Sequence, residues 1–327
     1  MSFPRLVLTA GEPAGIGADI ILDLAQKEWA AELVVVTDPA LLTTRAATLN
    51  IPIQLEPLFD LNHIPTTHQP GVLKIVTEKM AAPCVAGQLN QENAKFVLDT
   101  LRRATDLCLK HQANALITGP VQKSLLNKID SFFHGHTEFL GNLCGSHQTL
   151  MLFVVDNLKV ALLTTHLPLS KVSSAITSEK LISTIRLLHA ELKNRFSISN
   201  PHIAICGLNP HAGEEGLLGR EEIDVMIPAL SVLKKEGMRI AGPLSADTVF
   251  RQEYDAILAM YHDQALPVIK YIGFDRAVNV TLGLPFIRTS PDHGTALDIA
   301  GTGRASSESM KAAIEFAIQL AQLHNRS

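Results

Sequence analysis

The stretch Lys159-Val-Ala-Leu-Leu-Thr-Thr-His166 is a short apolar run with a histidine at its end. Asp255-Ala-Ile-Leu-Ala-Met-Tyr-His262 repeats the arrangement, and His211 follows the run His202–Cys206 after a short turn containing Gly, Asn and Pro. Continuous apolar runs of this length are typical of buried parallel strands. Ligands of open α/β sheets bind at the carboxyl ends of such strands. The three runs therefore predict an α/β fold that places three histidines where a ligand binds.

Apolar runs alternate with helical stripes along the rest of the chain, which predicts a mainly parallel sheet. Further strands are expected at residues 5–9, 33–37, 115–118, 150–155 and 277–282. The segment 150–164 resembles a hairpin with its turn at Asp156-Asn157, so one local antiparallel pair is expected. Three sets of apolar residues at helical spacing are predicted to be the core-facing sides of helices. They are Val97, Leu101, Ala104 and Cys108; Leu181, Ile185, Leu188 and Leu192; and Met310, Ile314, Ala317 and Ala321.

Composition excludes several classes of function. The 28 basic and 32 acidic residues give a net charge of −4, which provides no footprint for nucleic acid or an anionic membrane. No apolar run is long enough for a membrane span, and the N-terminal stretch lacks the pattern of a signal peptide. Four scattered cysteines are expected to be reduced, buried thiols of a cytoplasmic protein: Cys84, Cys108, Cys144 and Cys206.

Convergence of His166, His211 and His262 would form a divalent metal site. Three neutral imidazoles leave an open coordination position, and an open position is typical of a catalytic metal. The alternative is that each histidine is structural, since the chain has 13 histidines and some lie near strand ends by chance.

A glycine motif, Gly15-Ile-Gly17-Ala-Asp-Ile20, partly matches a dinucleotide fingerprint, and Asp38 follows at the end of the next expected strand. Ile20 occupies the third glycine position, so the match is incomplete. The alternative is a tight strand-to-helix turn.

Further polar residues are candidates for binding an oxyanion. His136 and Thr137 begin a predicted helix, where backbone N–H groups would assist them, although Thr137 could simply cap the helix. Lys123 lies at the end of a turn that follows a predicted strand. It could bind an oxyanion, or it could equally be a surface charge. Lys270, Asn279 and Arg288 lie in largely apolar sequence and could bind a carboxylate or phosphate, or form surface ion pairs.

Eight motifs in unbroken order between about residues 5 and 305 resemble the 4-hydroxythreonine-4-phosphate dehydrogenase family of vitamin B6 biosynthesis. They are Gly11-Glu-Pro-Ala-Gly-Ile-Gly17, Thr118-Gly-Pro-Val121, Gly135-His-Thr-Glu-Phe139, Thr164-Thr-His-Leu-Pro168, Gly207-Leu-Asn-Pro-His-Ala-Gly-Glu214, Gly242-Pro-Leu-Ser-Ala-Asp-Thr248, Met260-Tyr-His-Asp-Gln264, and Asn279-Val-Thr-Leu-Gly-Leu-Pro-Phe-Ile-Arg-Thr-Ser290 with Asp292-His-Gly-Thr295.

The resemblance implies a two-domain α/β fold similar to isocitrate and isopropylmalate dehydrogenases, with mainly parallel sheets and a cleft between the domains. Residues 1–130 with 285–327 are expected to form one domain, and residues 131–284 the other, carrying the metal ligands and the dimer interface. This fold binds NAD or NADP without the glycine fingerprint. The family is a homodimer with shared active sites, a divalent metal such as zinc, magnesium or cobalt, and a small phosphorylated amino acid as substrate.

The resemblance also assigns roles to individual residues. It implies that His166 and His211 of one chain bind the metal together with His262 of the second chain. It implies substrate binding by His136, Thr137, Lys270, Asn279 and Arg288.

The reaction implied is oxidation of 4-phosphohydroxy-L-threonine at C3, followed by decarboxylation to 3-amino-2-oxopropyl phosphate. The C3 hydroxyl loses a proton as its hydride passes to NAD, and a divalent metal would assist both steps. Asp247 is the candidate for orienting a ligand histidine or the substrate amine, and Lys270 is the candidate for proton transfer. Electrostatic binding of substrate would explain Lys270 equally well.

Two other functions compete with this one. A dehydrogenase of threonate or erythronate 4-phosphate would keep the metal and phosphate positions. An acyl-phosphate transferase of the phosphotransacetylase type has a related fold but needs neither the three histidines nor NAD.

Overall fold

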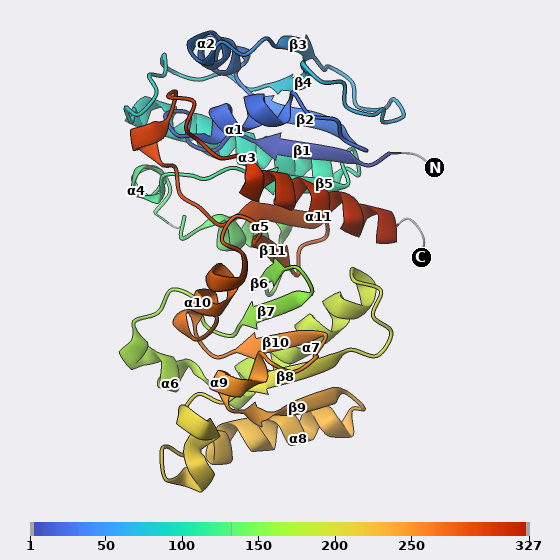
Figure 1. Cartoon of the computed structure of the whole chain (residues 1–327), viewed down its shortest axis with the longest axis vertical. Helices are drawn as coiled ribbons and strands as arrows, with labels where there is room; N and C mark the ends of the chain where they lie inside the picture. Colours follow the sequence, from blue (N-terminus) through green and yellow to red (C-terminus); the bar gives the residue numbers. More distant parts are fainter. Residues whose placement is uncertain (1–2, 132, 325–327) are drawn as a thin grey trace. The chain divides into compact units, whose positions relative to one another are not determined.

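The computed structural model describes residues 3–131 and 133–324, which form two compact units (Figure 1). The first unit contains the described residues up to Thr149 and those from Leu284 onward, and the second contains residues 150–283. Each unit contains six hydrogen-bonded strands, with helices packed against them. The α/β fold with mainly parallel strands, expected from the sequence, is confirmed.

In the first unit all six strands are parallel, in the spatial order β3-β4-β2-β1-β5-β12. These strands are β1 (Arg5–Thr9), β2 (Glu32–Thr37), β3 (Gln54–Pro57), β4 (Val72–Thr77), β5 (Ala115–Thr118) and β12 (Ile287–Pro291). The helices are α1 (Gly17–Leu24), α2 (Pro39–Leu49), α3 (Ala94–Leu109), α4 (Lys123–Leu126), α5 (His136–Cys144) and α11 (Glu308–His324). Every residue of β1, β2, β5 and β12 is buried, which explains why three of these four strands appear in the sequence as continuous apolar runs.

The second unit combines a parallel core with an antiparallel edge, in the order β11-β6-β7-β10-β8-β9. Its strands are β6 (Leu150–Val155), β7 (Leu158–Leu162), β8 (His202–Cys206), β9 (Arg239–Leu244), β10 (Ala256–Ala259) and β11 (Val278–Leu282). Its helices are α6 (Val172–Ala175), α7 (Ser178–Asn194), α8 (Ile227–Lys235), α9 (Ala246–Val249) and α10 (His262–Gly273). The expected hairpin is confirmed: β6 and β7 pair antiparallel, and Asp156 takes a left-handed backbone at their turn.

Helix α5 lies in a different unit from the one that the sequence predicted. The expected boundary was at residue 130, whereas the chain passes into the second unit after Thr149. The reason is packing, because Phe133, Phe139 and Leu140 join the core cluster that contains the apolar face of α3. That face is the predicted stripe of Val97, Leu101, Ala104 and Cys108, and all four are buried.

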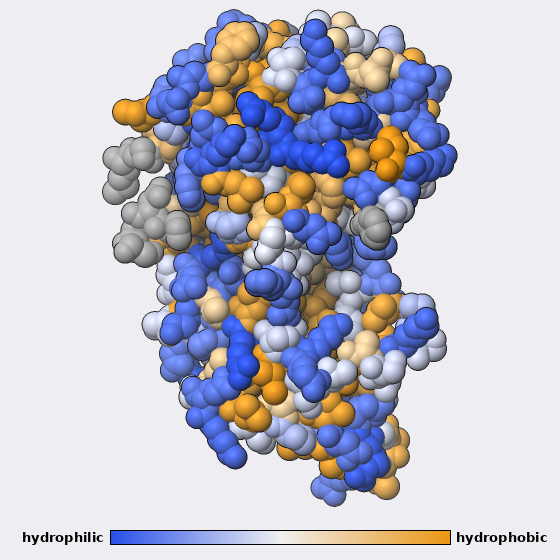
Figure 2. Space-filling model, turned by 180° about the vertical axis from the view of Figure 1, so that it is seen from behind, coloured by the Kyte–Doolittle hydropathy of each residue, from blue (hydrophilic) through white to orange (hydrophobic). Residues whose placement is uncertain are grey.

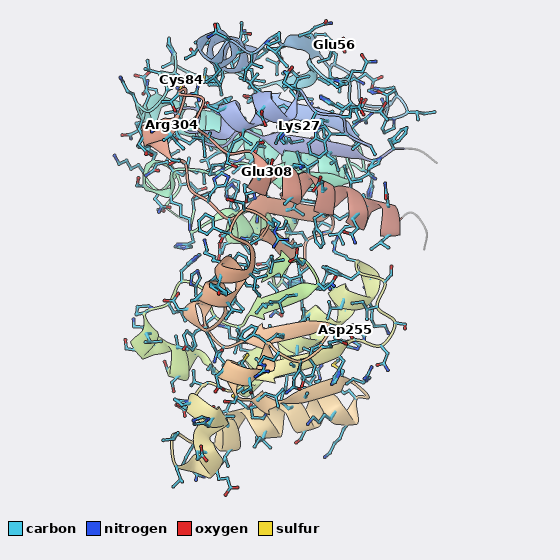
Figure 3. All side chains as sticks on the ribbon, viewed as in Figure 1. Lys27, Glu56, Cys84, Asp255, Arg304 and Glu308 are labelled. Atoms are coloured by element: carbon cyan, nitrogen blue, oxygen red, sulfur yellow. The ribbon has the colours of Figure 1, made fainter. Side chains whose placement is uncertain are left out.

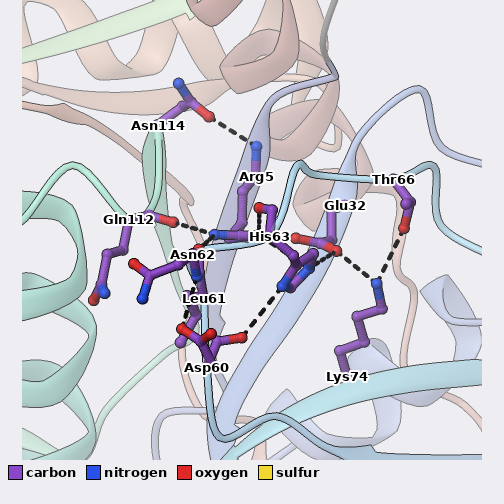
Figure 4. A network of polar contacts seen from close by, with 10 residues as sticks. All are labelled: Arg5, Glu32, Asp60, Leu61, Asn62, His63, Thr66, Lys74, Gln112 and Asn114. Carbon is purple, nitrogen blue, oxygen red and sulfur yellow. Dashed lines mark hydrogen bonds and ion pairs between the residues drawn. The ribbon is translucent and has the colours of Figure 1, made fainter.

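A buried ion network secures the amino ends of β1 and β2 (Figure 4). Arg5 donates from Nε to the carboxylate of Glu32 and from Nη1 to the carbonyl of Gln112, 2.9 Å away. Lys74 and His63 both contact Oε1 of Glu32, at 2.6 and 2.9 Å. Burial alone would raise the pKa of Glu32, but the hydrogen bonds from Lys74, His63 and Arg5 outweigh it and lower the pKa to about 2. Glu32 is therefore ionised and holds four chain segments together.

The surface mixes polar and apolar residues, as one face of the molecule shows (Figure 2). Phe59, Leu169 and Tyr271 are among the large apolar side chains that are mostly exposed. None of the described helices is long and apolar enough to cross a membrane.

Candidate active site

The three histidines predicted as metal ligands follow three adjacent parallel strands. β10 pairs with β7 on one side and with β8 on the other. His166 follows β7, His262 is the first residue of α10 after β10, and His211 lies in the turn Pro210–Gly216 after β8. The arrowheads of β7 and β10 in Figure 1 point toward the same edge of the unit. The prediction that these histidines follow parallel strands is confirmed, and the structure shows that the three strands are neighbours.

His166 and His262 of the same chain lie side by side. Their ring centroids are 5.9 Å apart, with the ring planes inclined by 43°. Both line a cavity of about 440 Å³. The ends of β7 and β10 are joined by hydrogen bonds, since Oγ1 of Thr164 donates to the carbonyl of Met260 at 2.7 Å. Neighbouring strands with bonded ends therefore bring these two imidazoles together.

One ring nitrogen of His262 contacts a carboxylate. Its Nδ1 lies 2.6 Å from Oδ1 of Asp263. A histidine that binds a metal through one nitrogen usually donates its other N–H to a carboxylate or carbonyl, which fixes the orientation of the ring. The contact with Asp263 leaves Nε2 of His262 available for a metal.

His211 occupies an unusual backbone and lies near Asp247. His211, Ala212, Glu214 and Glu215 all have left-handed φ values, between 43° and 55°. Left-handed backbone is unfavourable for residues other than glycine, so outside contacts must support this turn. The pKa of Asp247 is lowered, chiefly by a hydrogen bond from Ser245 and also by the nearby His211.

The three histidines do not form a complete set within one chain. Among residues 3–131 and 133–324, no group of three or more His, Cys, Asp or Glu is placed to hold a metal ion. The resemblance pairs His166 with His211, whereas the structure places His262 beside His166. His166 and His262 are therefore two candidate ligands that one chain brings together.

In the first unit, His136 is the first residue of α5 and Thr137 the second. Nε2 of His136 is buried and has no hydrogen-bond partner among the described residues. Burial holds the pKa of His136 well below its usual range, and the positive charges of Arg288 and Lys123 lower it further. The imidazole is therefore neutral at pH 7, and a buried polar nitrogen of this kind suits a ligand.

Arg288 brings a buried positive charge to the same part of the first unit. Its side chain lies in β12, and Nη2 donates to Oγ1 of Thr118 at 2.6 Å. Burial lowers the pKa of Arg288 to about 9, while Glu138 raises it, so the guanidinium stays protonated at pH 7. A buried guanidinium near the start of α5 favours an oxyanion such as phosphate.

The two other residues predicted to bind substrate lie in the second unit. Oδ1 of Asn279, in β11, is buried and makes no hydrogen bond with any described residue. Nζ of Lys270, in α10, lies 5.0 Å from the ring centroid of Phe274. Asn279 therefore has an unused acceptor, and Lys270 makes a cation–π contact.

Asp38 and Gly17 of the partial dinucleotide motif have structural roles. Both carboxylate oxygens of Asp38 accept backbone N–H groups, from Ala40 at 2.8 Å and from Met80 at 2.9 Å. Asp38 thus caps α2. A Cβ at Gly17 would lie 1.7 Å from the carbonyl oxygen of Ala10. Gly17 is required by the tight turn into α1, which was the alternative interpretation.

Sequence reasoning did not find three polar residues beside the histidines. Asp263 contacts His262, and Gln264 and Glu222 hold the turn before His211. Asp263 and Gln264 directly follow His262 in the sequence. This position next to a candidate ligand is the one sequence feature that could have identified them. The partners of Glu222 lie 13 and 14 residues away, and no sequence pattern marks them.

A model of the family described as pyridoxal phosphate biosynthetic protein PdxA matches residues 28–317. The chain belongs to this family. A 4-hydroxythreonine-4-phosphate dehydrogenase of Serratia proteamaculans is 51% identical over 320 residues, covering 97% of each chain. One of Vibrio vulnificus is 49% identical over 323 residues, 97% of this chain and 98% of the relative. The crystal structure of the Klebsiella pneumoniae 4-hydroxythreonine-4-phosphate dehydrogenase has a TM-score of 0.89 and 35% identity, covering 98% of this chain and all of that one.

Proposed function

We propose that the chain oxidises 4-phosphohydroxy-L-threonine at C3 with NAD or NADP. The hydride of C3 passes to the nicotinamide and the hydroxyl proton is released, which leaves a 3-oxo acid. Loss of carbon dioxide from this β-keto acid then gives 3-amino-2-oxopropyl phosphate for vitamin B6 biosynthesis. Support comes from membership of the PdxA family and from two relatives of about 50% identity whose names state this activity.

The observation that carries the proposal is the pair of imidazoles, His166 and His262, in one cavity beside Asp263. These two histidines would hold a divalent metal with His211 supplied by a second copy of the chain, in a homodimer. Imidazole ligands suit zinc and cobalt better than magnesium. Such a metal, when bound, lowers the pKa of a coordinated hydroxyl and polarises a carbonyl. Asp263 would orient His262, and Asp247 would orient His211 or the substrate amine; the lowered pKa of Asp247, to which His211 contributes, supports the first role.

The substrate phosphate is assigned to the first unit. The unpartnered Nε2 of His136, the hydroxyl of Thr137 and the buried guanidinium of Arg288 supply donors for its oxygens. Neutral His136 donates without adding charge, whereas Arg288 balances part of the dianion. Asn279 and Lys270 are the other residues that we propose to bind substrate, and Lys270 is also the candidate for proton transfer during decarboxylation.

The compartment proposed is the cytoplasm. Cys84, Cys108, Cys144 and Cys206 are all free thiols, which suits a reducing compartment.

The test is NADH formation, followed by absorbance, with 4-phosphohydroxy-L-threonine and with threonate 4-phosphate in parallel. Each reaction is run with and without a chelator and after metal is restored. Turnover of the amino acid alone, abolished by chelator and restored by metal, supports the proposal. Preference for threonate or erythronate 4-phosphate would assign the enzyme a different substrate and leave the proposed metal and phosphate sites unchanged. Failure with all of these substrates after metal is restored would reject a dehydrogenase and favour the acyl-phosphate transferase.

A further inference from the structure

The turn that leads to His211 is held by a buried carboxylate. Glu222 is only 2% exposed. Its Oε1 accepts the backbone N–H groups of Leu208 and Asn209, each at 2.8 Å, and its Oε2 accepts Nδ2 of Asn209 at 3.0 Å. Three hydrogen bonds from one side chain thus fix the two residues that precede Pro210 and His211.

The same turn is tied to the helix that begins with His262. Gln264, in the first turn of α10, accepts the N–H of Met260 at Oε1, 2.7 Å away. Its Nε2 donates to the carbonyl of Gly207, also at 2.7 Å. Gln264, in α10, therefore connects the ends of β10 and β8. His262 follows the first of these strands and His211 follows the second.

We propose that Gln264 and Glu222 are positioning residues for the shared metal sites, to which one chain contributes His262 at one site and His211 at the other. They fix residues 207–209 from two sides, and so set the positions of His211 and His262 without contacting the metal. The inference rests on the proposed metal function, because it assumes that both histidines are ligands.

The backbone of the turn explains why outside support is needed. His211 and three residues that closely follow it are left-handed, a conformation that costs free energy for residues with a Cβ. A turn of this kind keeps one conformation only when its surroundings determine it. A second carboxylate adds to the support, since Glu221 accepts Nδ2 of Asn209 at 2.8 Å and the hydroxyl of Ser173, in α6, at 2.6 Å.

The test uses two variants. Gln264→Met removes the hydrogen bonds to Met260 and Gly207. Glu222→Gln keeps one oxygen to accept the backbone N–H groups of Leu208 and Asn209 but loses the oxygen that accepts the side-chain amide of Asn209. Asp255→Asn is the matched control, because Asp255 accepts the backbone N–H of His202 at 2.7 Å at the other ends of β8 and β10. Figure 3 shows Asp255 on the side of the second unit away from α10. The full-length chain is stripped of metal, its melting temperature is measured, and Co²⁺ is titrated while the visible absorption of the bound ion is followed.

Both site variants should bind Co²⁺ at least about tenfold more weakly than the wild type, as loss of an orienting partner commonly does. Asp255→Asn should bind as the wild type does, even if its melting temperature falls. Wild-type affinity in a folded Gln264→Met variant would overturn the inference and leave the metal function intact. A wild-type chain that binds no Co²⁺ would overturn the metal function itself, which is a distinguishable result.

Discussion

His166 and His262 face one cavity from the ends of two bonded strands, with 5.9 Å between their ring centroids. The pairing follows from strand order, because β10 lies between β7 and β8. Oγ1 of Thr164 in addition bonds the carbonyl of Met260, which fixes the two strand ends against each other. This relationship is the basis of our proposal that His166 and His262 of one chain bind one metal, with His211 supplied by a second chain.

Replacing His211 by alanine should remove both bound metal and activity. Loss of an orienting partner commonly costs 10- to 100-fold in metal affinity, so loss of a ligand should weaken binding by more than about 100-fold. Elemental analysis after dialysis measures the metal. His202→Ala is the control, since His202 packs against Tyr254 at the start of β8. Full metal content in folded His211→Ala would remove His211 from the ligand set.

Replacing Lys270 by methionine separates proton transfer from binding. If Lys270 transfers a proton, kcat should fall by about 10² to 10⁴ at saturating substrate. Lys270→Arg keeps the positive charge over the ring of Phe274 but is a poor proton donor, so it should stay impaired. Steady-state kinetics measures both variants. An unchanged kcat with a raised KM, restored by arginine, would assign Lys270 to electrostatic binding.

Replacing Arg288 by glutamine should weaken the binding of phosphate. Removing one partner of a buried charge pair costs about 2 kcal/mol or more, so KM should rise by at least about 30-fold. The melting temperature of the substrate-free chain should not fall, because burial lowers the pKa of Arg288 and so disfavours its charged form. Arg276→Gln is the control, since Arg276 pairs with Asp156 at the surface. Unchanged KM and unchanged inhibition by inorganic phosphate would contradict the assignment.

The stability of the chain should fall in acid because of Glu32. Its pKa is about 2 in the folded chain but ordinary when unfolded, so the unfolded chain takes up the proton first as the pH falls. The stabilisation is complete above the ordinary glutamate pKa and is lost as the pH falls from there toward 2. Its size is about 3 kcal/mol at neutral pH.

Glu32→Gln tests this dependence by urea unfolding at pH 7 and at several values below 5. The variant should be less stable at pH 7, and the difference from the wild type should shrink as the pH falls. Glu236→Gln is the control, because Glu236 is exposed and pairs with Arg186 at the surface. A constant difference across this range would show that ionisation of Glu32 does not stabilise the fold.

The sequence predicted most of the buried strands, but it missed the fully buried β12, the interior strand β4 and the edge strands β3 and β9. β1, β5 and β8 have apolar residues at most positions, so their bounds were visible. β3 was missed because its residues are mostly exposed at the edge of the sheet, and β9 because it is an edge strand interrupted by Gly242 and Pro243.

The site could be predicted in outline only. Histidines after three apolar runs indicated one edge of a sheet, because parallel strands end on the same side. Which histidines are neighbours depends on the order β7-β10-β8, and spacing along the chain does not determine that order. The left-handed backbone at His211 and the bonds from Glu222 depend on contacts that form only in the folded chain.

The most direct test of the shared metal site mixes inactive subunits. His166→Ala and His211→Ala chains are combined, subunit exchange is confirmed by mass spectrometry, and metal content and NADH formation are measured. The pairing of His166 with His262 predicts recovery of one intact site per hybrid dimer, because one chain keeps that pair and the other keeps His211. Mixing His166→Ala with His262→Ala should recover nothing. Recovery only in that second mixture would contradict the account and assign His166 and His211 to one chain, and recovery in neither would contradict sharing.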